Sequence, residues 1–129
     1  MGKASRTKGH SFERKLAKIF MSALGIPFKR GIQFRYGAKE GCDVEGSSIF
    51  HIEAKRHKLC NIRAALRQAE ADCAEDGKGR IPIAVTKDDR GPILVTLNLE
   101  HFLPMMQIAH YLFHDSESGT GNNGSGNKT

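Results

Sequence analysis

Asp43, Glu53 and Lys55 are the residues of this sequence whose types and spacing could carry out chemistry together. Glu53 and Lys55 lie two positions apart in a run with strand character, and alternate residues of a β-strand share a face. The apolar and the polar members of that run would take opposite faces: Phe50, Ile52 and Ala54 against His51, Glu53 and Lys55. An acid and a lysine would therefore stand side by side on a strand that otherwise looks buried.

Asp43 would reach this pair across a tight turn. If Gly46-Ser47-Ser48 is a three-residue loop, Asp43 lies opposite His51 and diagonally across from Glu53, on the same face. Two converging carboxylates would hold a hard divalent cation, Mg²⁺ or Mn²⁺, through oxygen ligands. Lys55 beside that cation would orient a water molecule or stabilise charge growing on a phosphate oxygen. A register slip of one residue would put Asp43 on the wrong face.

The alternative interpretation of Glu53 and Lys55 is a solvent-exposed ion pair on a half-buried strand. The charge distribution favours the catalytic interpretation, because residues 1–67 hold 15 Lys and Arg against 5 Asp and Glu. A basic half of this strength predicts a polyanionic partner, most commonly nucleic acid, although ordinary solubility charge would look the same. The basic residues expected to contact a phosphate backbone are Lys8, Arg14, Arg30, Arg35, Lys39, Arg56 and Lys58, with Arg63 and Arg67 nearby.

The sequence pattern predicts the elements that must position these residues. Ser11 can cap a helix over 12–24 with one apolar stripe, and Asn61 can cap a second over 62–75. A turn at 99–102 should precede a last helix that begins near Pro104, because proline is costly inside a helix. Strands are expected at 28–35, 42–45, 49–56, 81–86 and 93–97, with a loop at 36–41. This order predicts an α/β sandwich with a mixed sheet.

The chain of 129 residues is long enough for one domain. We expect the folded domain to span 11–114, between a flexible basic arm at 1–10 and a disordered Gly-, Asn- and Ser-rich tail at 115–129. No apolar run approaches the roughly 20 residues of a membrane span, and no segment looks like an export signal. Three cysteines without C-x-x-C spacing favour reduced thiols over disulfides or zinc. A cytoplasmic protein without membrane contact is therefore predicted.

Gly41-Cys42-Asp43-Val44 followed by Ile52-Glu53-Ala54-Lys55 resembles the D…E-x-K signature of the PD-(D/E)xK nuclease superfamily. Cys42 departs from the proline that often precedes the aspartate. Residues 9–20 resemble the opening helix of archaeal-type Holliday-junction resolvases within that superfamily. The resemblance implies a restriction-endonuclease-like core, in which helices flank a mixed five-stranded sheet.

The same resemblance assigns further roles. It implies that Glu13 joins the metal site, whereas the plain alternative is a first-turn glutamate that favours the helix dipole. Gln68 matches a glutamine that some members carry after E-x-K, although the tyrosine expected four residues later is Asp72. Tyr36 and Lys39 fall where resolvases contact the cut strand. A homodimer is implied as well, with apolar contacts available from Met105, Met106, Tyr111, Leu112 and Phe113.

Three functions stay open at this point. The first is an Mg²⁺-dependent, structure-selective DNA endonuclease that resolves four-way (Holliday) junctions. The second is a nickase, or a repair or restriction endonuclease, on the same fold. The third is a non-catalytic nucleic-acid-binding module, in which Glu53 and Lys55 form a structural pair.

Overall fold

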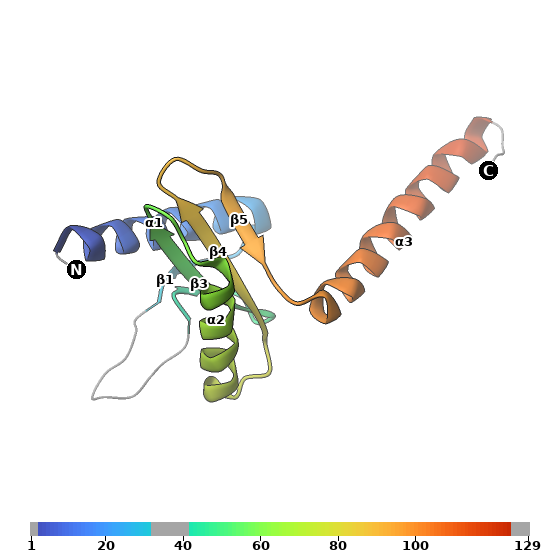
Figure 1. The fold of residues 1–129 in the computed structure, drawn as a ribbon. Coiled ribbons are helices and arrows are strands. Elements are labelled where there is room, and N and C mark those ends of the chain that lie inside the picture. Colours follow the sequence, from blue (N-terminus) through green and yellow to red (C-terminus); the bar gives the residue numbers. More distant parts are fainter. Residues whose placement is uncertain (1–2, 32–41, 125–129) are drawn as a thin grey trace. The chain divides into compact units, whose positions relative to one another are not determined.

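The computed structural model describes residues 3–31 and 42–124 (Figure 1). Eight elements follow one another along the chain: α1 (Lys3–Leu24), β1 (Lys29–Arg30), β2 (Val44–Glu45), β3 (Phe50–His57), α2 (Ile62–Asp76), β4 (Ile81–Asp88), β5 (Ile93–Thr96) and α3 (Leu99–Gly124). Part of the strand expected at 28–35 and the loop at 36–41 lie outside the described residues, and so do Arg35, Tyr36 and Lys39.

The five strands form one mixed sheet in the order β1-β2-β3-β4-β5. β3 and β4 pair in parallel, and the other neighbouring strands pair antiparallel. The parallel pair follows from the connection between the two strands, since a parallel crossover needs about a dozen residues and α2 supplies them. The α/β architecture with a mixed five-stranded sheet, predicted from the sequence, is confirmed.

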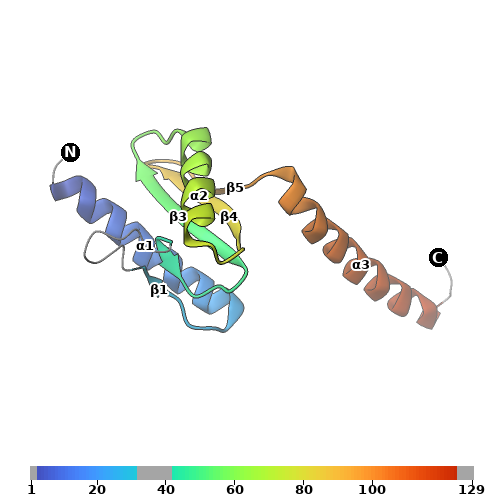
Figure 2. The same cartoon turned by 90° about the horizontal axis from the view of Figure 1, so that it is seen from below.

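Helices α1 and α2 lie on opposite faces of this sheet (Figures 1 and 2). The apolar stripe of α1 packs against the face of β3 that carries Ile52 and Ala54. The core on this side is built from Phe12, Leu16, Ala17, Phe28, Val44, Ile52, Ala54, Ile83 and Val85. The alternation predicted for β3 therefore places its apolar residues under α1 and its polar residues on the other face.

Helix α2 covers the polar face of β3 with small side chains. Its buried residues, Ala65, Ala69 and Cys73, recur every four positions and so form one narrow stripe. The Asn61 side chain caps the helix by accepting a hydrogen bond of 3.0 Å from the amide of Ala64. Gly77, with a φ of 67°, ends it in the left-handed conformation that glycine adopts without strain. Small residues let the helix come close to β3 and β4.

Helix α1 begins at Lys3, so residues 3–10, which were expected to form an arm outside the helix, are its first turns. Gly9 does not stop the helix, because a glycine inside a helix costs only about 1 kcal/mol relative to alanine. The Lys8 ammonium donates to Asp89 at 3.0 Å, which ties this end of α1 to the end of β4. A contact 81 positions away in the sequence cannot be inferred from local pattern.

The register of β2 against β3 differs by two residues from the predicted one. Val44 pairs with Ile52, so the connection after Glu45 is longer than a three-residue loop, and Asp43 lies beside Glu53 instead of diagonal to it. The predicted turn length was wrong. A shift of two residues preserves the face on which every side chain projects, so the predicted convergence of the two carboxylates holds.

Helix α3 belongs to a second compact unit, which begins at Asn98. It begins at Leu99 and passes through Pro104, so the predicted start near Pro104 was wrong. It also continues through 115–124, the first part of the predicted disordered tail, since each added helical residue needs only its backbone hydrogen bond. Its large apolar side chains are exposed: Leu99, Phe102, Leu103, Met106, Ile108, Tyr111, Leu112 and Phe113. Among the described residues, no helix is both long and apolar enough to cross a membrane.

The core under α1 generates a first prediction. Replacing Leu16 by alanine should lower the free energy of unfolding by about 2–5 kcal/mol, because the side chain is fully buried and leaves a cavity. Ile19→Ala, on the same helix but 41 % exposed, is the matched control and should cost under about 1 kcal/mol. Urea denaturation followed by circular dichroism measures both. Equal losses for the two variants would contradict the packing described for α1.

Candidate active site

The candidate site is a cavity of about 260 Å³ beside β3, where β2 begins. Its walls come from three parts of the chain: Gly9, His10 and Glu13 on α1; Asp43 before β2 with Glu53, Ala54, Lys55, Arg56 and His57 on β3; and Gln68 on α2. In the described part of the sheet, β2 pairs with β3 at Val44 and Ile52, whereas β3 continues to His57. The last residues of β3 thus line the cavity together with residues of α1 and α2.

Asp43 is fixed against β3 by hydrogen bonds to the backbone. Its Oδ2 accepts from the amide of Ala54 at 2.8 Å, and its own amide donates to the carbonyl of Ile52 at 3.0 Å. The side chain is 7 % exposed. Asp43 is therefore held in place before any ligand binds.

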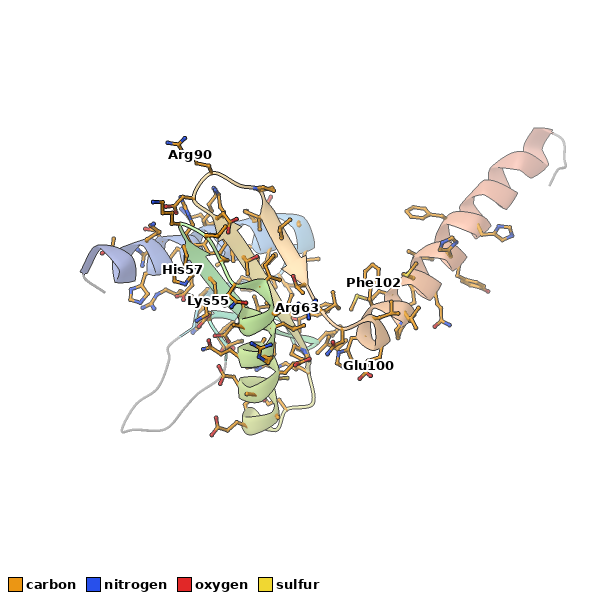
Figure 3. All side chains as sticks on the ribbon, viewed as in Figure 1. Lys55, His57, Arg63, Arg90, Glu100 and Phe102 are labelled. Carbon is orange, nitrogen blue, oxygen red and sulfur yellow. The ribbon has the colours of Figure 1, made fainter. Side chains whose placement is uncertain are left out.

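Glu53 and Lys55 share the face of β3 that alternation predicted. Glu53 is only 3 % exposed, so the alternative of a solvent-exposed ion pair is wrong for this residue. The Lys55 ammonium lies 4.0 Å from Glu53 Oε2 and is itself half-buried. Figure 3 shows Lys55 and His57 on the same stretch of β3. The structure thus brings together the three residues singled out by their types and spacing.

Glu13 reaches the same cavity from α1. It lies about three turns into a helix that begins at Lys3, so the alternative role of a first-turn glutamate at the helix dipole does not apply. The residue is 8 % exposed, and its Oε1 has no hydrogen-bond partner among the described residues. The Arg30 guanidinium lies 3.6 Å from that oxygen. A buried carboxylate oxygen without a hydrogen bond is costly, and the cost would be relieved by a cation in the cavity.

The pKa values of Glu13 and Glu53 are both raised above their ordinary values. Burial, then the nearby charge of Asp43, raises the pKa of Glu53 to about 8, although Lys55 acts in the opposite direction. Burial and Asp43 likewise raise the pKa of Glu13 to about 7, against the effect of Arg30. A hydrogen bond between Glu53 and Asp43 contributes to the first shift, and it requires a proton on one of the two carboxyl groups. The charge of Asp43 therefore opposes the ionisation of both glutamates.

These residues fit an Mg²⁺ or Mn²⁺ ion with few protein ligands. Within the described residues, no three His, Cys, Asp or Glu side chains surround one point as a complete metal cage would. Mg²⁺ is usually held by only one or two carboxylates, with water and substrate phosphate completing the coordination. Asp43 and Glu53 meet that requirement, and Glu13 lines the same cavity.

The basic residues predicted to contact DNA occupy different settings. Lys8 and Arg56 both pair with Asp89, at 3.0 and 3.4 Å, and Arg56 also lines the cavity. Arg30 pairs with Glu13. Arg14 and Lys58 are exposed.

Reasoning from the sequence missed two histidines that line the cavity. His57 follows Lys55 by two positions, so the alternation that placed Glu53 and Lys55 could have placed His57 with them. His10 comes from the segment that was taken for an arm, and no local pattern indicates its position. Gln68, suggested only by resemblance, does lie in the cavity wall.

Comparison with known proteins gives one match. The chain matches the family described as "Phage putative PDDEXK endonuclease" over residues 4–117. No curated protein and no solved structure matches it. The matched region contains the whole sheet and every residue described above in the cavity wall.

The raised pKa values predict how stability depends on pH in the absence of metal. Between about pH 5 and 8, folded Glu53 and Glu13 retain protons that they would lose in the unfolded chain, so the folded state becomes less stable as pH rises. A loss of about 1 kcal/mol would lower the melting temperature of a domain of this size by roughly 4 °C. Thermal melts in EDTA at pH 5.5, 7 and 8.5 measure the effect.

The control for this prediction is Glu53→Gln, which cannot ionise and should reduce the pH dependence, leaving the part that Glu13 contributes. Added Mn²⁺ should raise the melting temperature of the unsubstituted protein at pH 8.5, because binding favours the folded state. Identical pH profiles for the two proteins would show that Glu53 has no raised pKa.

Proposed function

This chain belongs to the PDDEXK endonuclease family, and we propose that it hydrolyses phosphodiester bonds in DNA with Mg²⁺ or Mn²⁺ held by Asp43 and Glu53. The observation that carries the proposal is the burial of these two carboxyl groups beside each other, with Lys55 4.0 Å from one of them. A divalent ion bound there would polarise the phosphate and lower the pKa of a water molecule.

Each residue of the cavity has a definite part in this proposal. Asp43 offers a carboxylate that the amide of Ala54 already holds in place. Glu53 would offer a second one, and it would have to give up its proton to hold a cation, since its pKa is raised to about 8 when no cation is present. Lys55 is placed to orient the attacking water or to stabilise negative charge on the phosphate. Glu13 assists from α1.

A purely binding role accounts less well for the same geometry. Buried carboxyl groups beside one another oppose folding, and they repel the phosphates that a binding module would have to attract. Exposed basic residues such as Arg14 and Lys58 would suffice for binding alone. An acidic cavity is compatible with DNA binding if a cation lies between the carboxylates and the phosphate and offsets their repulsion.

We further propose that the substrate is branched DNA and that the enzyme acts on it as a homodimer. The proposed place of action is inside the cell. The likeness of residues 9–20 to the opening helix of junction resolvases supports the substrate. Cutting a four-way junction symmetrically takes two active sites, and a dimer supplies them. The exposed apolar residues of α3, such as Leu103 and Phe113, support an interface on that helix.

Replacing Glu53 by glutamine should reduce cleavage at least about 100-fold, because a ligand to the cation is lost. DNA binding should stay the same or become tighter, since a negative charge beside phosphate is removed. Cleavage of labelled DNA in Mg²⁺ and gel-shift titration in EDTA measure the two effects. Glu75→Gln, at an exposed position of α2, is the matched control and should cut normally. If Glu53→Gln cuts DNA at the normal rate, Glu53 is not part of the active site and the proposed site is wrong.

Incubation with a four-way junction and with linear duplex of the same sequence tests the substrate. Paired, symmetric nicks in the junction alone are expected of a resolvase. Cutting of both substrates would show a general nuclease and remove the junction proposal. Binding without cutting in either Mg²⁺ or Mn²⁺ would remove both enzymatic proposals.

A further inference from the structure

The connection between β3 and α2 carries an exposed leucine close to the cavity. Leu59 is 78 % exposed, the highest fraction among the large apolar side chains that the structure describes. It follows His57, a residue of the cavity wall, by two positions. The chain allows no more than about 20 Å between Leu59 and Glu53, because six extended residues span no further. Single exposed apolar side chains are common on protein surfaces, so a role for this one has to come from its setting.

The backbone that carries Leu59 is short and held in place. Four residues connect the end of β3 to the start of α2. The amide of Cys60 donates to Asp88 Oδ1 at 2.7 Å, and its thiol donates to the carbonyl of Lys87 at 3.4 Å. The next residue, Asn61, caps α2. A ligand that covers Leu59 would therefore not have to order a flexible loop, which favours binding.

The exposed leucine has basic neighbours along the chain. Residues 54–69 contain five Lys and Arg and no Asp or Glu. Lys58 and Arg63, on either side of the leucine, are exposed. At the adjoining end of β4, Asp88 and Asp89 are already paired with hydrogen-bond donors of this chain. The connection thus presents one large apolar side chain between exposed positive charges.

DNA offers the matching pair of chemistries. Its phosphates are negative and lie on the outside, whereas its stacked bases form an apolar interior. Proteins that kink DNA insert apolar side chains, leucine among them, between base steps and unstack the bases in part. A protein partner is favoured less, since interfaces between proteins are depleted in lysine.

We propose that Leu59 is a wedge that enters the base stack of DNA beside the cut site, while Lys58 and Arg63 contact the neighbouring phosphates. The inference rests on the proposed function, since it assumes that the phosphate to be cut lies in the cavity. At about 3.4 Å per nucleotide, the wedge acts within about six nucleotides of the cut. It favours DNA whose bases are already unstacked, as at a branch point or a mismatch, because less stacking has to be broken there.

The test follows base unstacking with 2-aminopurine, a fluorescent base that brightens when it leaves the stack. The full-length protein in Mg²⁺ first maps the cut on whichever DNA it cleaves, four-way junction or linear duplex. 2-Aminopurine is then placed in turn at about six positions on each side of the cut. Protein is added in EDTA, which allows binding without cutting. The unsubstituted protein should raise the fluorescence at one or two of these positions.

Leu59→Ala should abolish the rise in fluorescence and slow cutting at least about 10-fold, because the apolar contact with the bases is lost. Its melting temperature should not change, since the side chain is exposed in the free protein. Leu59→Met keeps a side chain that can act as a wedge, and it should retain both the rise and the cutting. Lys58→Ala should weaken binding and lower its salt dependence but leave the rise at saturating protein.

Ile49→Ala is the matched control, because Ile49 is 57 % exposed and lies at the opposite end of β3 from Leu59. It should behave like the unsubstituted protein in every assay.

Three results would overturn the wedge and leave the proposed function intact. The first is a normal rise and normal cutting by Leu59→Ala. The second is no rise at any position with an unsubstituted protein that cuts. The third is a Leu59→Ala protein that loses a dimer, as measured by sedimentation, but keeps the rise. An unsubstituted protein that cuts neither DNA in Mg²⁺ or Mn²⁺ would overturn the proposed function and the wedge with it.

Discussion

Two carboxyl groups buried next to each other, those of Asp43 and Glu53, form the interaction on which the rest of this structure depends. Burial and mutual repulsion oppose the ionisation of such a pair, and the raised pKa of Glu53 expresses that opposition. The arrangement persists because the surrounding fold holds it in place. The amide of Ala54 holds Asp43, and Lys55 and His51 bracket Glu53. A fold that tolerates this cost would keep the proposed cation site ready for use.

The sheet and its two helices explain how the pair is held. β2 places Asp43 beside Glu53, and the parallel partner β4 offers only the small side chain of Ala84 next to Glu53. The alanine stripe of α2 closes over the same face without filling it with bulky side chains. On the opposite face, α1 packs on the apolar side of β3 and still brings Glu13 to the cavity. Bulkier residues on α2 would push it away from the sheet and open Glu53 to water, which would reduce the electrostatic effects that the proposed chemistry uses.

Predictions from the local sequence pattern succeeded for features that depend on a single helix or strand. The limits of α2 followed from Asn61 and Gly77, and the faces of β3 followed from alternation. Predictions failed where two distant segments decide. The register of β2 was wrong by two residues because the length of a connection cannot be read from its composition. The first turns of α1 were predicted to be an arm because the residue that Lys8 contacts, Asp89, lies 81 positions away in the sequence, just after β4.

The sequence by itself determined that Glu53 and Lys55 project from one face of a strand, since the period of two is a property of the extended backbone. It also determined the family signature, because the positions of Asp43, Glu53 and Lys55 along the chain are fixed by the sequence itself. Only the tertiary structure decided that Glu53 is buried, that Glu13 joins it and that His51 stands behind it in contact with Asp76. Burial and pKa depend on what other segments bring to a residue, and those segments meet only when the sheet and its helices pack together.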